Sequence, residues 1–187
     1  LISMAKYLGS RGVNYIMHCG MPVVTLRGKG FEDEVQKLIS EATGLPSSTS
    51  IKSAIKAFQS LGVQNIAVLS PYPEVVHKSA IKFLQDSDFR IAADHTEDVV
   101  FKKLQDITPR HIFEIGCELV KASDKVDCVY IPCNQWRGFE AAIHLEQRLG
   151  IPCVSGAHAD MWEAFKTLKI DNTLPGNGLL FDRLQRS

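Results

Sequence analysis

Apolar and amphipathic segments alternate along the chain, and turn-forming residues separate them. Ile66–Ser70 is a short continuous apolar run, of the kind that is buried on both faces of a parallel sheet. By contrast, Phe31, Val35 and Ile39 recur at the spacing of one helix face. The predicted strands cover 13–18, 66–70, 89–93, 126–131 and 151–155, and the predicted helices cover about 30–42, 54–61, 75–84, 109–119, 136–149 and 158–168. Strands that alternate with helices predict an α/β fold with a largely parallel sheet.

The chain contains an internal repeat. Val13–Gly20 can be laid over Val126–Cys133, and both copies lead into a helix, a Gly-Leu-Pro or Gly-Ile-Pro turn and a small polar cluster. The repeat predicts two pseudo-symmetric lobes, each of which presents the carboxyl end of a strand to a shared cleft. We expect residues 1–61, completed by 160–187, to form the first lobe, and residues 62–159 to form the second.

The two copies differ in what precedes them. Two predicted strands and a helix within Gln64–Ala93 precede the later copy, whereas only a helical piece, Leu1–Gly9, precedes the earlier one. By this analogy we expect the first lobe to lack its N-terminal strand and helix, roughly 40 to 60 residues.

Composition excludes several classes of partner. The 187 residues include 21 Lys and Arg against 21 Asp and Glu, so the formal net charge is zero. A nucleic-acid-binding protein usually has a basic excess, and we expect no nucleic-acid partner. No apolar run approaches the roughly 18 to 20 residues of a membrane span, so we expect no membrane partner either. A small-molecule enzyme or binder remains, and homo-oligomerisation is left open.

The cysteines and histidines do not form recognisable ligand motifs. Five cysteines are present, no pair has C-x-x-C spacing, and no signal peptide opens the sequence, which favours a reducing cytoplasm. The histidines show no metal-ligand spacing, and Gly28-Lys29-Gly30 lacks the third glycine of a dinucleotide fingerprint. We therefore expect neither a metal nor a cofactor.

An ordered set of segments between about residues 10 and 170 carries a family resemblance. The segments are Glu41–Ser50, Leu61–Val63, Ile66–Pro73, Tyr130–Asn134 and Arg148–Gly156, followed by Trp162. In these segments the chain resembles the aspartate/glutamate racemase superfamily, in the branch of maleate cis-trans isomerases and arylmalonate decarboxylases. The resemblance implies two pseudo-symmetric lobes with the active site between them. It also implies cofactor-independent chemistry on the carbon next to a carboxylate.

The resemblance assigns roles to the cysteine-bearing strand ends. Two-base racemases of the superfamily offer one cysteine from each lobe, whereas the decarboxylase keeps only the later one and has glycine in place of the first. Cys133 matches the later catalytic cysteine, Gly20 matches the earlier position, and Cys19 lies one residue before it. A one-residue offset at a strand end turns a side chain to the other face. We therefore favour a one-cysteine site at Cys133, with Cys19 as a displaced second candidate.

The resemblance also implies an anion pocket for a carboxylate and an enediolate. Its expected members are Tyr72, Ser48, Thr49, Gly20, Met21 and Asn134. Relatives usually have Thr, Ser or Asn where this chain has Met21-Pro22, so one hydroxyl of the usual pocket is missing.

The resemblance and the residues together predict an isomerase- or decarboxylase-type enzyme for a small dicarboxylate, either maleate-like or arylmalonate-like. The reaction would pass through an enediolate-like intermediate, with a cysteine as acid/base or nucleophile. Two alternatives remain open at this point: a non-catalytic carboxylate-binding relative, and an amino-acid or hydantoin racemase. We expect the remaining cysteines, Cys117, Cys128 and Cys153, to lie in the core.

Overall fold

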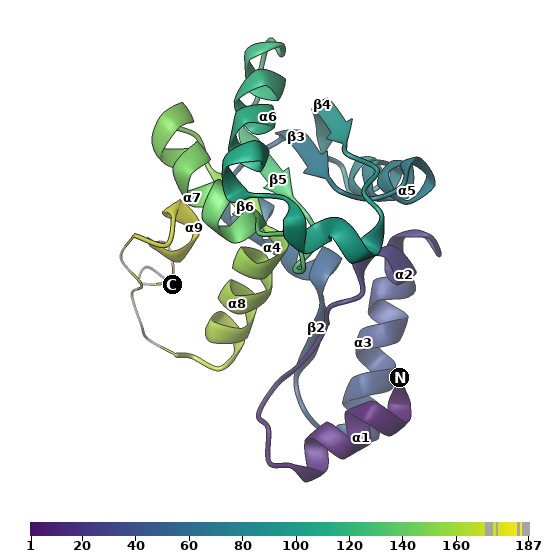
Figure 1. The fold of residues 1–187 in the computed structure, drawn as a ribbon. Helices are drawn as coiled ribbons and strands as arrows, with labels where there is room; N and C mark the ends of the chain where they lie inside the picture. The colour runs from purple at the N-terminus through teal and green to yellow at the C-terminus, as the bar shows by residue number, and fades with distance from the viewer. Residues whose placement is uncertain (171–173, 175, 183, 185–187) are drawn as a thin grey trace.

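The strands form two parallel sheets in the computed structural model, which describes residues 1–170, 174, 176–182 and 184 (Figure 1). One sheet has the order β1–β2, and the other has the order β4–β3–β5–β6. The strands are β1 (Ile16–His18), β2 (Ser47–Thr49), β3 (Asn65–Ser70), β4 (Arg90–Thr96), β5 (Cys128–Ile131) and β6 (Cys153–Ser155). Each of these pairings is parallel, which confirms the predicted α/β class.

Helices connect the strands and cover the sheets. They are α1 (Ile2–Ser10), α2 (Met21–Thr25), α3 (Phe31–Thr43), α4 (Ser50–Leu61), α5 (Glu74–Gln85), the 3-10 helix η1 (Phe101–Asp106), α6 (Pro109–Lys121), α7 (Gly138–Leu149), α8 (Gly156–Thr167) and α9 (Leu179–Asp182). Their ends follow local chemistry. The Thr108 hydroxyl accepts the His111 N–H at the start of α6, and left-handed Gly44 (φ 71°) ends α3.

The four-stranded sheet is buried on both faces. Ile66 and Val68 of β3 belong to the hydrophobic cluster that includes α4 and α8, whereas Ala67 and Leu69 belong to the cluster that includes α6 and α7. Successive side chains of a strand point to opposite faces, so both sets of positions must be apolar. This double burial explains the continuous apolar run in the sequence.

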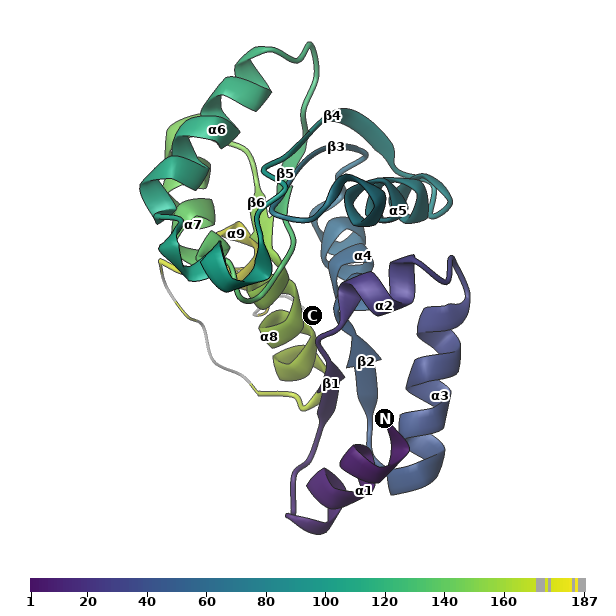
Figure 2. The same ribbon diagram turned by 45° about the vertical axis from the view of Figure 1, so that its right-hand side comes forward.

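The two sheets lie toward opposite ends of the molecule (Figure 2). The β1–β2 sheet lies with α1 and α3, and α4 and α8 pack against each other between it and the four-stranded sheet. One hydrophobic cluster runs from Val35 and Ile39 of α3 to Val68 and Tyr130 of the larger sheet. The predicted lobe boundary after residue 159 falls within α8, and the division into lobes stays a prediction. Within the expected completion by 160–187, residues 171–173, 175, 183 and 185–187 lie outside the described residues.

Four elements were not predicted. Ser47–Thr49 of the hydroxyl cluster forms strand β2 before the chain enters α4, and α2, η1 and α9 lie in segments for which no helix was predicted. The strand expected over 89–93 instead runs to Thr96. None of the helices in the described part of the chain is long and apolar enough to cross a membrane.

Candidate active site

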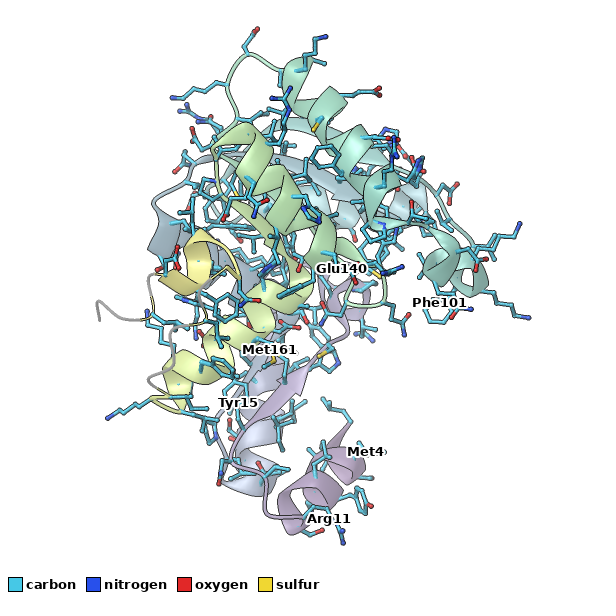
Figure 3. The ribbon with its side chains drawn as sticks, turned by 60° about the vertical axis from the view of Figure 1, so that its left-hand side comes forward. Met4, Arg11, Tyr15, Phe101, Glu140 and Met161 are labelled. Atoms are coloured by element: carbon cyan, nitrogen blue, oxygen red, sulfur yellow. The ribbon has the colours of Figure 1, made fainter. Side chains whose placement is uncertain are left out.

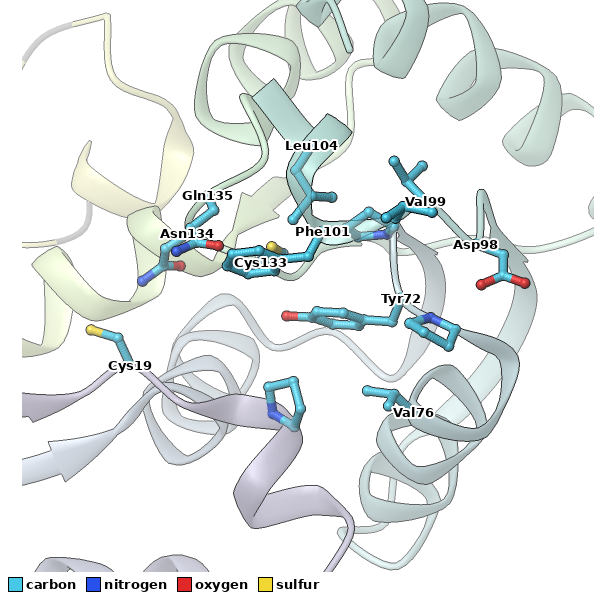
Figure 4. A pocket seen from close by; sticks show the side chains of 14 residues that line it. Cys19, Tyr72, Val76, Asp98, Val99, Phe101, Leu104, Cys133, Asn134 and Gln135 are labelled. Atoms are coloured by element: carbon cyan, nitrogen blue, oxygen red, sulfur yellow. The ribbon is translucent and has the colours of Figure 1, made fainter. Parts of the chain in front are cut away.

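The carboxyl ends of three parallel strands open into one cavity of about 600 Å³ (Figure 4). Cys19 follows β1, Tyr72 follows β3, and Cys133 and Asn134 follow β5. Ligands of parallel α/β folds bind at this edge because the loops after the strands converge there. Among the described residues, the lining consists of Cys19, Pro22, Pro71, Tyr72, Pro73, Val76, Asp98, Val99, Val100, Phe101, Leu104, Cys133, Asn134 and Gln135.

Cys133 adopts a backbone conformation that is unusual for a side-chain-bearing residue. Its φ is 82°, in the left-handed region where a Cβ atom is strained. The Cys133 carbonyl accepts the Trp136 N–H at 3.2 Å, which closes the turn after β5. Such strain persists only where the surrounding structure enforces it, and it concentrates at functional sites. The turn directs a half-buried thiol into the cavity.

The Tyr72 hydroxyl points toward the side of the cavity on which both cysteines lie (Figure 4). The hydroxyl lies close enough to the Cys133 side chain to interact with it electrostatically. Burial raises the pKa of the Tyr72 phenol, and the adjacent Cys133 raises it further, so the group is a neutral hydrogen-bond donor at neutral pH. The backbone of Tyr72 is fixed on both sides, because its N–H donates to Ser70 Oγ at 3.4 Å and its carbonyl accepts from Thr96 Oγ1.

Asn134 depends on a close approach to α8. Its Nδ2 donates to Asp160 Oδ2 at 2.6 Å. A Cβ atom on Gly156 would lie 2.3 Å from Asn134 Oδ1, so a side chain at position 156 would displace the amide. The glycine at the start of α8 is therefore needed to place Asn134.

Cys19 lines the same cavity as Cys133, although the alternation of a strand predicted that it would be displaced. The alternation does not apply because β1 ends at His18 and Gly20 (φ −104°, ψ 59°) already turns the chain into α2. Gly20 itself does not line the cavity. A Cβ atom there would lie 2.7 Å from His18 Cε1, so the imidazole occupies the space where a side chain at position 20 would begin.

The structure does not bring three of the expected anion-pocket side chains to the cavity. Met21 is buried, and its sulfur accepts the Tyr130 hydroxyl at 3.5 Å. Ser48 is fully buried, and the Thr49 hydroxyl accepts the Lys52 N–H as the cap of α4. These hydroxyls and the thioether serve the packing of α2, β2 and α4, and their role in substrate binding stays a prediction.

Asp160 is a polar residue behind the cavity that the sequence reasoning missed, as it also missed the apolar walls. It lies on α8, it is 6% exposed, and its Oδ2 accepts hydrogen bonds from Ser50 Oγ at 2.8 Å and Asn134 Nδ2 at 2.6 Å. Cys19 Sγ lies 3.7 Å from the same oxygen. Burial raises the pKa of the Asp160 carboxyl, and the three donors partly offset this. A signal was available, because an acidic residue interrupts the buried face of α8 between Ala159 and Trp162.

The cavity has a polar end and an apolar end. The polar end holds the thiols, the Tyr72 hydroxyl and the Asn134 amide, and no lysine or arginine of the described residues lines it. Pro71, Val76, Val99 and Leu104 form the apolar walls. Phe101 of η1 completes the rim and points outward, 70% exposed (Figure 3). Nowhere in the described residues do three or more His, Cys, Asp or Glu side chains gather in a way that could hold a metal ion.

Comparison with known proteins gives a consistent result. The family model of arylmalonate decarboxylase matches residues 1–181. The arylmalonate decarboxylase of Bordetella bronchiseptica is 23% identical over 184 residues, which cover 97% of this chain and 77% of that protein.

Solved structures show the same fold. A crystal structure of arylmalonate decarboxylase aligns with a TM-score of 0.90 at 23% identity and covers 97% of this chain and 80% of that one. A cysteine-to-serine variant of Nocardia farcinica maleate cis-trans isomerase, which holds a covalently bound succinylcysteine intermediate, aligns with a TM-score of 0.88 at 18% identity. That alignment covers 96% of this chain and 76% of the isomerase.

Proposed function

Because the chain belongs to the arylmalonate decarboxylase family, we propose that it is a cofactor-independent enzyme that decarboxylates a substituted malonate at the cavity between Cys19, Tyr72 and Cys133. One observation carries this proposal. A strained cysteine, beside a half-buried tyrosine, lies at the polar end of a cavity whose other walls are mainly apolar.

The proposed reaction needs a stabilised carbanion and a proton donor. The bond between the α-carbon and one carboxylate breaks, CO₂ leaves, and the electron pair moves into an enediolate on the remaining carboxylate. Neutral donors aimed at this developing charge lower the barrier. The Tyr72 hydroxyl and the Asn134 amide belong to residues that line the cavity, and we assign the donor role to them. The Cys133 thiol then gives its proton to the α-carbon, and solvent returns a proton to the thiolate.

The walls favour an apolar substituent on the substrate. A malonate substituted with an aryl group would place its carboxylates at the thiol end and its ring among Pro71, Val76, Val99 and Leu104. Burial of a ring contributes about 25 cal/mol for each Å² removed from water. Maleate has no such group, so it would leave this part of the cavity unused.

Cis-trans isomerisation of a maleate-like substrate is the second candidate, because two thiols line the cavity. In this reaction the Cys133 thiolate would add to the double bond, the single bond that forms would rotate, and the thiolate would leave again. The succinylcysteine in the Nocardia farcinica isomerase supports this chemistry in a structural relative. Either reaction requires a small carboxylate as partner.

Incubation of the purified protein with phenylmalonate and, separately, with maleate tests the proposal. We expect release of CO₂ and phenylacetate from phenylmalonate, measured by NMR. Formation of fumarate without decarboxylation would favour the second candidate. Binding of both compounds without turnover would instead indicate a carboxylate-binding protein.

A further inference from the structure

Asp160 and Cys19 form a group that the proposed reaction at Cys133 does not use. We propose that they share a proton and act as one acid–base pair, a second proton-transfer site in the cavity that also holds Cys133. The inference rests on the proposed function for its substrate, but the existence of the pair can be tested without any substrate.

The geometry places a thiol, a carboxylate and two further donors around one oxygen atom. Asp160 Oδ2 receives Asn134 Nδ2 at 2.6 Å, Ser50 Oγ at 2.8 Å and Cys19 Sγ at 3.7 Å. The thiol also lines the cavity, whereas the carboxyl group lies behind it, 6% exposed. The Cys19 thiol, which faces the cavity, can therefore pass its proton to the buried Asp160 carboxylate.

The second oxygen of Asp160 shows why the carboxyl group can take a proton. Oδ1 is buried and has no hydrogen-bond partner among the described residues. A buried, unpartnered oxygen is costly when it carries part of a negative charge and less costly as a neutral carbonyl. A proton on Oδ2 makes Oδ1 such a carbonyl, and the Ser50 hydroxyl can rotate to accept from Oδ2.

The other charged and titratable groups near the pair do not prevent a proton from moving between Cys19 and Asp160. No ion pair joins Asp160 to a lysine, arginine or histidine within the described part of the chain. Tyr15, Tyr72 and Tyr130 sense the charge of Asp160, but burial raises the pKa of each, to about 12 for Tyr15, so all three are neutral phenols. Burial lowers the pKa of His18, which is therefore neutral beside Cys19.

Two protonation states of the pair complete the cycle. With one proton, the pair rests as the Cys19 thiol and the Asp160 carboxylate. Transfer of that proton to Oδ2 leaves a thiolate, which can take a proton from the α-carbon of a substrate. The pair then holds two protons, and the reverse steps deliver one to a carbanion. The charge returns to Asp160, where the Ser50 and Asn134 donors stabilise it.

The reactivity of Cys19 tests the pair directly. Peptide-resolved alkylation by iodoacetamide across pH 6 to 10 reports the thiolate fraction of each cysteine. In the unmodified protein we expect the pKa of Cys19 to lie above that of a free thiol, because partial desolvation of its sulfur and the charge of Asp160 both raise it. A value below that of a free thiol would overturn the pair, and this measurement requires no variant.

The isosteric variant Asp160→Asn removes the charge and keeps an acceptor. We expect alkylation of Cys19 at pH 8 to become about tenfold faster, since a fall of one pKa unit gives tenfold more thiolate. Cys133 and Cys117 serve as internal controls, and their rates should stay within about twofold. An unchanged or slower rate at Cys19 would show that Asp160 does not hold its proton.

Deuterium exchange tests the catalytic use of the pair. Each enantiomer of 2-phenylpropionate, a product of the proposed substrate class, is incubated with the protein in deuterated water. We expect both enantiomers to exchange their α-proton. In Cys19→Ala, exchange of one enantiomer should fall at least tenfold while the other persists through Cys133. If the unmodified protein decarboxylates phenylmalonate but exchanges only one enantiomer, the second site is wrong. If it acts on no substrate, the proposed function fails, and the alkylation experiments alone then test whether Cys19 and Asp160 share a proton.

Discussion

Two cysteines reach the same cavity from the ends of β1 and β5, each of which pairs in parallel with the next strand of the chain, but their surroundings differ. Cys133 is half-buried, sits in a left-handed turn and contacts a neutral phenol. Cys19 is exposed, follows a strand of three residues and faces a buried carboxyl group on another element. The backbone defines the first thiol position, whereas a network of side chains defines the second.

The difference shows that the end of a strand determines where a cysteine lies, whereas the neighbouring side chains determine its acid–base behaviour. At the β5 end, the strained turn and the neighbouring Tyr72 hydroxyl hold the Cys133 thiol in one position, which suits a proton donor. At the β1 end, Asp160 accepts from Ser50, Asn134 and Cys19, so the state of the thiol depends on a carboxylate. Four changes would test this contrast, and they follow in order of expected effect.

Cys133→Ala should have the largest effect. Loss of the proton donor is expected to lower kcat for decarboxylation about 10³-fold, within the range typical of general acid catalysis. Steady-state CO₂ release measures the effect. Cys117→Ala is the matched control, since this half-buried thiol lies outside the cavity. Full turnover by Cys133→Ala would reverse the roles that we assign to the two strand ends.

Acid should weaken the helix that carries Asp160. His158 is buried in the first turn of α8, stacks on Phe139 with ring centroids 4.0 Å apart, and shares a capping box with Ser155. Burial lowers its pKa to about 4. As the pH falls, the imidazole of the unfolded chain takes up a proton before that of the folded protein does. The free energy of unfolding should therefore be largest above about pH 6.5 and should decrease on the order of 3 kcal/mol as pH falls to 4. Urea titrations at several pH values measure this loss, which His158→Gln should flatten. Equal slopes in both proteins would contradict it.

Tyr72→Phe removes one hydroxyl from the Cys133 end. If that hydroxyl donates to the enediolate, kcat should fall about 10²-fold with little change in KM. The pH dependence of Cys19 alkylation serves as the control and should be unaffected by the substitution. A change confined to KM would mean that the phenol only binds the substrate.

Gly20→Cys should have the smallest effect, and it probes the β1 end. The new Cβ atom meets His18 Cε1 at 2.7 Å, so the imidazole must move. Such crowding typically costs about 1–3 kcal/mol, and we expect the lower part of this range in chemical denaturation because His18 is only half-buried. Adding His18→Ala should recover most of the loss. Strictly additive effects of the two substitutions would show that the ring and position 20 do not compete for space.

Much of the fold could be predicted from the sequence, because buried parallel strands and amphipathic helices have clear periodicities. Ile66–Ser70 and Phe31–Thr43 show such patterns. Strands of three residues, such as β2, are too short to show a period, and the hydroxyls of Ser47 and Ser48 resemble a helix cap.

The site could be predicted only in part. The family resemblance singled out Cys133, Tyr72 and Asn134, and their places after strand ends explain why the three residues line one cavity. Asp160 lies within α8 and not after a strand, and it is 110 residues from Ser50 in sequence. Only the packing of α8 on α4 brings these two residues together. The displacement expected for Cys19 assumed a regular strand, and the chain leaves that geometry after His18.

The left-handed backbone at Cys133 lowers the stability of the fold relative to glycine at the same position, and this bears on how the residue is retained in evolution. Glycine adopts a φ of 82° without strain, so Cys133→Gly should relieve strain in the turn, on the order of 1 kcal/mol, while it removes the thiol. Selection for stability alone would drive this position toward glycine, and the cysteine persists only while its chemistry is under selection. A stability-guided redesign of this protein would choose glycine here and would lose the thiol on which the proposed reaction depends.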